Sequence, residues 1–203
     1  LDTITANRVT FTNFSGTYTL ASGTLNVMSN LTLANSAGSV VLTYIIGGPG
    51  GVTMDSSGSL RIYGLSPNTY SGGTIINRGT LSWGTMVNGI SPDCNHALGT
   101  GPVTLHSGAT LQFEKVSPTN ALILNGGTFQ SQNGWGVNWR GPVTVNSNTT
   151  LQANFSIAFS GNISGAGGFT KTSGNTVTFS GTNTYTGANV VQAGTLSCSK
   201  LAS

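Results

Sequence analysis

Carboxylate side chains are scarce in this chain of 203 residues, and their spacing does not favour acid–base chemistry. The four acidic residues are Asp2, Asp55, Asp93 and Glu114. Hydrolysis of a glycosidic bond requires two carboxylates close together. Elimination from an acidic sugar would require carboxylates that hold a metal and a nearby basic side chain. Because the four acids do not recur at a spacing that would bring two of them together, we expect no enzyme and no catalytic, cofactor-binding or metal-binding residues.

One segment gathers several potential metal ligands: Asp93, Cys94, Asn95 and His96. A closed zinc site needs four donors, and this short segment supplies too few of them. His106 is expected on a separate strand. Because Ser91, Pro92 and Asp93 are typical of a turn, we interpret the segment as a polar corner loop rather than a metal site.

Two tryptophans near an arginine leave two interpretations open. Trp135 and Trp139, together with Arg140, would make a platform on which a sugar ring stacks. The alternative is structural, because Trp135, Val137 and Trp139 are spaced as alternate residues of a strand and would then point inward. We favour the structural interpretation.

The charge content limits the classes of partner. Only 5% of the residues are charged, against roughly a quarter in average proteins, and the net charge is +3. The basic residues are scattered without a run, whereas affinity for nucleic acid depends on clustered cations. No apolar run approaches the roughly 20 residues that a membrane-spanning helix needs. The sequence therefore predicts neither nucleic-acid binding nor a membrane span.

Alternating apolar and polar residues indicate strands along the whole chain, and glycine (30 residues) is too frequent for long helices. The short alternating runs include Val9–Phe11, Leu31–Leu33, Leu60–Ile62, Val103–Leu105, Val143–Val145 and Val177–Phe179. Turn-forming Gly, Asn, Ser and Asp lie between them. The sequence therefore predicts an all-β protein.

A short anchor, a small residue followed by Thr or Ser and then a large apolar residue, recurs at uneven spacing. Its copies are Gly23–Leu25, Gly58–Leu60, Gly79–Leu81, Ala109–Leu111, Gly127–Phe129, Thr149–Leu151 and Gly194–Leu196. Uneven spacing argues against propeller blades and favours a solenoid, whose coils tolerate insertions at a corner. We therefore predict a single right-handed parallel β-helix (β-solenoid) domain over residues 1–203, with roughly nine or ten coils of about 20 residues.

The two cysteines are expected to remain unpaired with each other. In a solenoid, Cys94 and Cys198 would lie about five coils apart, or about 24 Å along the stack. A disulfide requires Cα atoms within about 7 Å. Cys198 occupies the second apolar position of its anchor, as Trp83 and Phe113 do, and is expected in the core.

Two long segments, residues 50–83 and 167–198, repeat the same pattern. Gly50-Gly-Val-Thr, Asn68-Thr-Tyr and Gly79-Thr-Leu in the first correspond to Gly167-Gly-Phe-Thr, Asn183-Thr-Tyr and Gly194-Thr-Leu in the second. The first copy has Met54-Asp55 where the second has Lys171-Thr172. The pattern resembles the autotransporter-associated β-strand repeat, also called the passenger-associated transport repeat, of bacterial surface proteins. This resemblance implies a parallel β-helix exported by bacteria, hence an extracellular or cell-surface location.

These observations favour a structural role. We expect a rigid extracellular β-solenoid module that stacks end to end on copies of itself, or that is cut from a longer solenoid. The first alternative is an adhesin or glycan-binding passenger that uses a side loop or the pair Trp135 and Trp139. A polysaccharide-degrading β-helix enzyme is the third.

Overall fold

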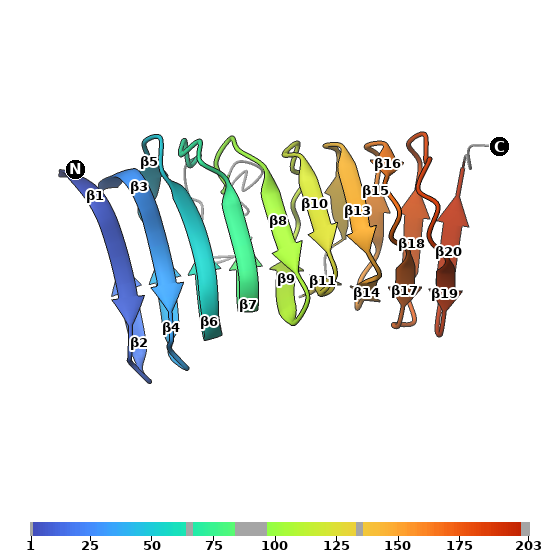
Figure 1. The fold of residues 1–203 in the computed structure, drawn as a ribbon, viewed down its shortest axis with the longest axis horizontal. Helices are drawn as coiled ribbons and strands as arrows, with labels where there is room; N and C mark the ends of the chain where they lie inside the picture. Colours follow the sequence, from blue (N-terminus) through green and yellow to red (C-terminus); the bar gives the residue numbers. More distant parts are fainter. Residues whose placement is uncertain (1, 64–66, 84–96, 133–135, 200–203) are drawn as a thin grey trace.

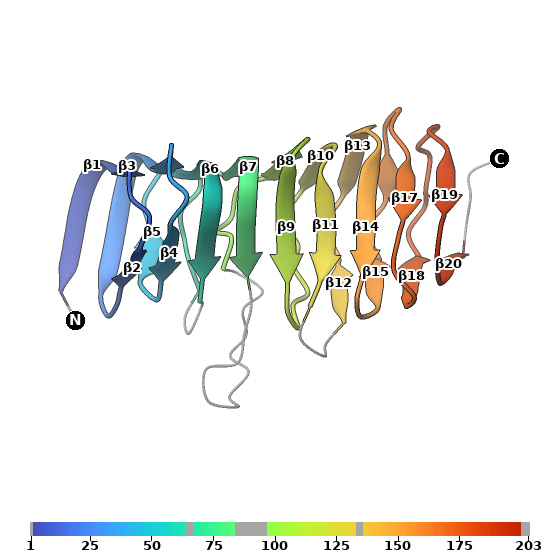
Figure 2. The same cartoon turned by 90° about the horizontal axis from the view of Figure 1, so that it is seen from below.

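The stacked parallel strands of this protein form a β-solenoid, which confirms the predicted fold class. A computed structural model describes residues 2–63, 67–83, 97–132 and 136–199, and these contain strands and no helix. The coils follow one another from the N-terminal end of the stack to the C-terminal end (Figures 1 and 2). There are about eight turns, slightly fewer than the nine or ten that the coil length predicts.

Strand pairing divides the solenoid into three faces, called here A, B and C. At the N-terminal end of the stack, face A comprises the first halves of β1 (Thr3–Thr12) and β3 (Thr24–Ala34), followed by β5 (Ile45–Gly47). At the C-terminal end, face A is the four-stranded sheet of β12 (Val137–Trp139), β15 (Ile157–Phe159), β18 (Thr176–Phe179) and β20 (Thr195–Cys198). Face B comprises the second halves of β1 and β3, the first halves of β6 (Gly51–Ile62) and β7 (Thr74–Trp83), and β8 (Val103–His106), β10 (Leu122–Asn125), β13 (Val143–Ser147) and β16 (Ile163–Ser164). Face C comprises β2 (Thr17–Leu20), β4 (Ser39–Leu42), the second halves of β6 and β7, and β9 (Ala109–Phe113), β11 (Thr128–Ser131), β14 (Thr149–Ala153), β17 (Phe169–Lys171) and β19 (Asn189–Val191).

Backbone hydrogen bonds also join neighbouring coils on face A where it contains no regular strand. The amide of Thr69 donates to the carbonyl of Ile46 at 2.8 Å, and the amide of Thr100 donates to the carbonyl of Tyr70 at 2.9 Å. Closer to the C-terminus, the amide of Asn138 donates to the carbonyl of Val116 at 3.1 Å. These bonds satisfy backbone groups that would otherwise be buried without partners, so the irregular segments stack as the strands do.

Alternation along each strand fills the interior. Ala109, Leu111 and Phe113 of β9 are buried, and Thr110 and Gln112 between them are half-exposed. Each inward side chain stacks on the inward side chain of the next coil. On face B, one such column contains Leu31, Val52, Thr74, Val103, Leu122, Val143 and Ile163. The alternating pattern in the sequence therefore identifies the core correctly.

The core changes in character along the stack. The N-terminal coils bury mainly aliphatic side chains, whereas the C-terminal coils bury a run of rings. The rings that contact one another are Trp83, Phe113, Phe129, Trp139, Phe159, Phe169, Phe179 and Tyr185. Their edge-to-face and tilted contacts, such as Phe113 against Phe129 at 4.5 Å between centroids, each contribute about 0.5–1.5 kcal/mol beyond burial.

Glycines of the anchors occupy corners where no side chain fits. Gly79 has a φ of 77° and Gly194 a φ of 72°, in the left-handed region. A Cβ on Gly79 would overlap the backbone carbonyl oxygen of Ser56. A Cβ on Gly194 would lie 2.6 Å from the carbonyl oxygen of Asn175. Each position therefore requires glycine for its conformation and for the closeness of the neighbouring coil.

We predict that Gly79→Val and Gly194→Val each lower the free energy of unfolding by at least about 1–3 kcal/mol, because a branched side chain adds backbone strain and a clash. Gly174→Ala is the matched control, because no atom lies within 4 Å of the added Cβ. Urea unfolding followed by circular dichroism measures the difference. Equal stabilities of wild type and both valine variants would contradict this assignment.

Candidate functional site

The acidic residues are dispersed over the described part of the molecule. Asp2 precedes β1, Asp55 lies in β6 and Glu114 follows β9, on three different coils. Asp55 accepts a hydrogen bond from Nε of Arg78 at 2.8 Å, and Arg78 also donates to Oδ1 of Asn35 at 3.2 Å. This exposed chain of contacts links three successive coils, and its ion pair contributes little stability. Because Asp55 is paired with Arg78, it belongs to this exposed chain of contacts between coils.

The predicted corner loop at residues 93–96 lies outside the described residues, as does Asp93 itself. His106 ends β8 and is half-exposed, with Asn125 beside it on the next strand. Within the described ranges, no three His, Cys, Asp or Glu side chains gather in an arrangement suited to a metal ion.

Trp139 is a core residue, so the sugar platform that would use it is wrong. Its side chain is fully buried, and its Nε1 donates to the carbonyl of Asn120 at 2.8 Å. The ring contacts Phe113 and Phe129. Trp135 lies outside the described residues. The structural interpretation, in which strand alternation directs Val137 and Trp139 inward, is confirmed for these two residues.

Cys198 faces inward but is only half-buried. It stands opposite Phe179 in the register of β18 and β20, and burial raises the pKa of its thiol. Trp83 and Phe113, which occupy the same position in their anchors, are fully buried as predicted. Cys198 is less buried than Trp83 and Phe113 because β20 is the last strand of its sheet, so in the described part of the chain its side chain is covered from one side only. Cys94 lies outside the described residues, so the absence of a disulfide stays a prediction.

The most specific part of the long repeat, Asn-Thr-Tyr, forms a hydrogen-bonded staple inside the solenoid. In the first copy, Asn68 is buried, and its Oδ1 accepts from the amide of Ile46 at 2.7 Å while its Nδ2 donates to the carbonyl of Ala97 at 2.7 Å. It therefore bridges the coil before and the coil after. The hydroxyl of buried Tyr70 shares a hydrogen bond of 2.6 Å with Thr74.

The second copy repeats the tyrosine contact. The hydroxyl of Tyr185 accepts from Nδ2 of Asn189 at 2.7 Å, four residues later, as Tyr70 pairs with Thr74. Burial raises the pKa of both tyrosines, and their hydrogen bonds oppose this rise. The tyrosine contact is thus local to its own segment in both copies, and in the first copy Asn68 makes the contact between coils.

Lys171 is a buried cation that the sequence does not predict. Its side chain is 1% exposed and lies in the inward column of face C between Leu151 and Val191. Its Nζ donates to the carbonyl of Ala193 at 2.7 Å and to the carbonyl of Ser173. Removal of the ammonium group from water lowers the pKa of Lys171. The ammonium group of Lys171 is therefore bound by two backbone carbonyl oxygens rather than by an acidic side chain.

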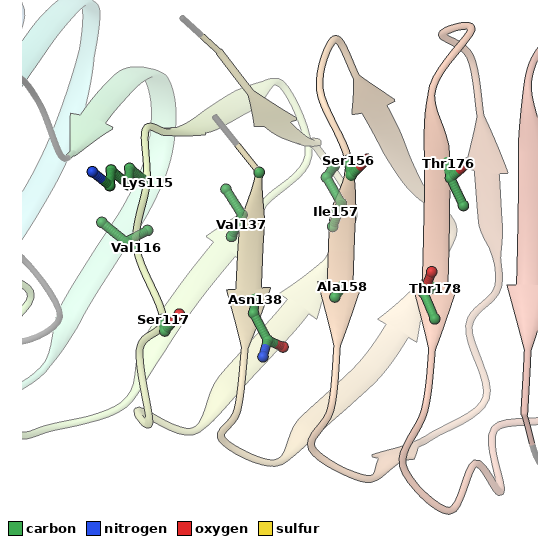
Figure 3. Close-up of a pocket in the computed structure, with 11 residues that line it drawn as sticks. Lys115, Val116, Ser117, Val137, Asn138, Ser156, Ile157, Ala158, Thr176 and Thr178 are labelled. Carbon is green, nitrogen blue, oxygen red and sulfur yellow. The ribbon is translucent and has the colours of Figure 1, made fainter. Parts of the chain in front are cut away.

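An open groove crosses the outer side of face A (Figure 3). Its volume is about 370 Å³. The lining combines buried apolar side chains with small polar ones: Lys115, Val116, Ser117, Gly136, Val137, Asn138, Ser156, Ile157, Ala158, Thr176 and Thr178. Oδ1 of Asn138 accepts from Ser160 at 2.5 Å. Because the lining contains no carboxylate, imidazole or thiol, this groove offers a surface for contact and no acid–base pair.

Two segments of the chain, residues 52–82 and 169–197, match the family model of the passenger-associated-transport-repeat. This confirms the resemblance that the sequence indicates. A search of curated proteins and a search of solved structures returned no match. Among the described residues, no helix is long and apolar enough to cross a membrane.

The two matching segments begin on different faces of the solenoid. Val52 of the first copy lies on face B, whereas the corresponding Phe169 lies on face C. Leu60 and its counterpart Val177 are likewise displaced, from face C to face A. Met54 and Lys171 hold equivalent inward positions despite this displacement. The repeat therefore specifies a succession of strands and corners that is independent of the face on which it starts.

The lowered pKa of Lys171 predicts a pH dependence of stability. Between the folded-state pKa and 10.5, the unfolded chain binds more protons at this lysine, so stability rises with pH and falls as pH drops through that window. We expect the free energy of unfolding of wild type to rise with pH relative to that of Lys171→Met, which lacks the titrating group. Urea unfolding of both proteins at a series of alkaline pH values tests this. Parallel pH profiles would show that Lys171 titrates as it does in water.

Proposed function

We propose that this chain is a non-enzymatic, extracellular structural module of the kind found in autotransporter passengers. The single observation that carries this proposal is the pair of passenger-associated transport repeats, in the first of which Asn68 bonds to the coil before and to the coil after. A secreted or surface-exposed location follows from the same repeats. A stack of coils joined by backbone hydrogen bonds on three faces is a rigid rod, which suits a stalk, coat or fibre.

The proposed rod lengthens by end-to-end stacking on a second copy. In the first coil, the inward-facing Ile4 and Tyr18 remain 52% and 53% exposed. In the last coil, the inward-facing Val191 remains 48% exposed. The outermost strands also offer a row of backbone donors and acceptors on their free edges. A parallel coil of another copy would cover the apolar side chains and bind these edges together.

Low charge supports this association. Exposed strand edges are usually protected by charged side chains, and charged residues are only 5% of this chain. Head-to-tail contact between unlike ends does not close on itself, so repeated contact produces a filament. We propose that the coil that covers each end of the solenoid belongs to a second copy of this chain.

We predict that the isolated chain forms concentration-dependent linear oligomers, and that Tyr18→Asp or Val191→Asp returns it to the monomer. Each aspartate would be buried without a partner when two ends meet, which costs several kcal/mol. Sedimentation velocity and negative-stain microscopy give the size and shape of the assemblies.

Met28→Asp is the matched control, because Met28 is 49% exposed within β3, at a corner of the second coil. It is expected to assemble as wild type does. A stable, folded monomer at tens of micromolar would contradict the stacking, and so would filaments formed equally well by all three aspartate variants.

A further inference from the structure

Face C carries a polar trough that runs along the axis of the solenoid, across β2, β4, β6, β7 and β9. Two outward columns of side chains form its walls. One wall contains Thr17, Ser39, Ser59 and Thr80, and the other contains Val41, Arg61, Ser82 and Gln112. Its volume is about 450 Å³. Four steps between neighbouring strands give it a length of about 19 Å.

Hydrogen bonds along each wall hold its polar groups in fixed positions. The hydroxyls of Ser39 and Ser59 lie 2.7 Å apart. On the other wall, Ser82 donates to Oε1 of Gln112 at 2.6 Å, and Gln112 donates to Oε1 of Gln130 at 3.0 Å. Each hydroxyl and amide still has capacity for a further hydrogen bond. The trough is therefore an ordered array of neutral donors and acceptors.

Arg61 supplies the charge of the trough. Its side chain is exposed, and Nη1 donates to the hydroxyl of Tyr63 at 3.2 Å. The lining contains no acidic residue. Arg61 is not part of the ion pair between Arg78 and Asp55 on the neighbouring face. A guanidinium in this position is suited to bidentate contact with a carboxylate.

These features select the chemistry of a partner. Nucleic acid carries one negative charge per phosphate and would require a row of cations. A peptide cannot add a strand here, because β4, β6 and β7 are each paired on both sides at this face. An extended chain rich in hydroxyls, with one carboxylate in the stretch that lies along the trough, matches neutral hydrogen-bonding walls and a single cation. We propose that the trough binds a sparsely charged polysaccharide along the solenoid axis, with a single uronate carboxylate on Arg61.

The test is calorimetric titration with an oligogalacturonate that is methyl-esterified at all but one residue and with its fully methyl-esterified form, which keeps the sugar backbone and removes the charge. We expect wild type to bind the acidic form more tightly, and Arg61→Ala to weaken that binding at least about tenfold. Ser82→Trp retains the charge and fills the trough, so it is expected to weaken the binding of both forms.

Arg140→Ala is the matched control, because Arg140 is exposed and lies outside the trough. It removes the same charge and is expected to bind as wild type does. The proposal is overturned if wild type does not bind the oligomer with one free carboxylate, if esterification of that carboxylate has no effect, or if the two arginine variants lose affinity equally. End-to-end assembly is measured without polysaccharide, so the failure of either proposal leaves the other standing.

Discussion

Within each ladder of the described residues, a strand pairs with the strand one coil before it and the strand one coil after it, except at the ends of the ladder, and this constraint governs the rest of the structure. Because the strands are parallel and in register, an inward residue stacks on the inward residue of the next coil. Corners must then allow the backbones of successive coils to approach closely, as at Gly79. Polar groups enter the interior only where they bond to those backbones, as Asn68 does. The hydrogen-bond ladder thus determines which side chains the core accepts.

Local alternation in the sequence was sufficient to predict the all-β class and much of the core, whereas the parallel solenoid was predicted from the recurring anchor and from the resemblance to the transport repeat. Leu111 and Phe113 are buried because they are two residues apart on one strand, and the same spacing places Val137 and Trp139 inside. Trp139 could serve either a core or a sugar platform on residue type alone. Its burial depends on Phe113 and Phe129 of preceding coils, whose relation to it appears only after stacking.

Lys171 and the trough of face C show why the remainder was not predictable from local patterns. A lysine is usually exposed, and its place in the core depends on the carbonyl of Ala193, which lies 22 residues further along the chain. The trough is assembled from strands separated by a whole coil each, so no continuous segment of sequence contains it. Arg61 is one scattered cation in the sequence, and its place in the wall of the trough is set only through the registers of β4, β6 and β7.

The displacement of the second long repeat by one face has a consequence for how such proteins change in length. If the pattern had to begin on a fixed side, duplicated segments would be tolerated only as whole turns. Because Val52 and Phe169 occupy equivalent places on different sides, the fold accepts an offset of whole turns plus one strand with its corner. A gene for such a rod can therefore gain or lose material in thirds of a turn, and each such event rotates everything downstream. Surface features beyond the insertion then point in a new direction, so evolution can reorient an exposed binding face without altering any residue within it.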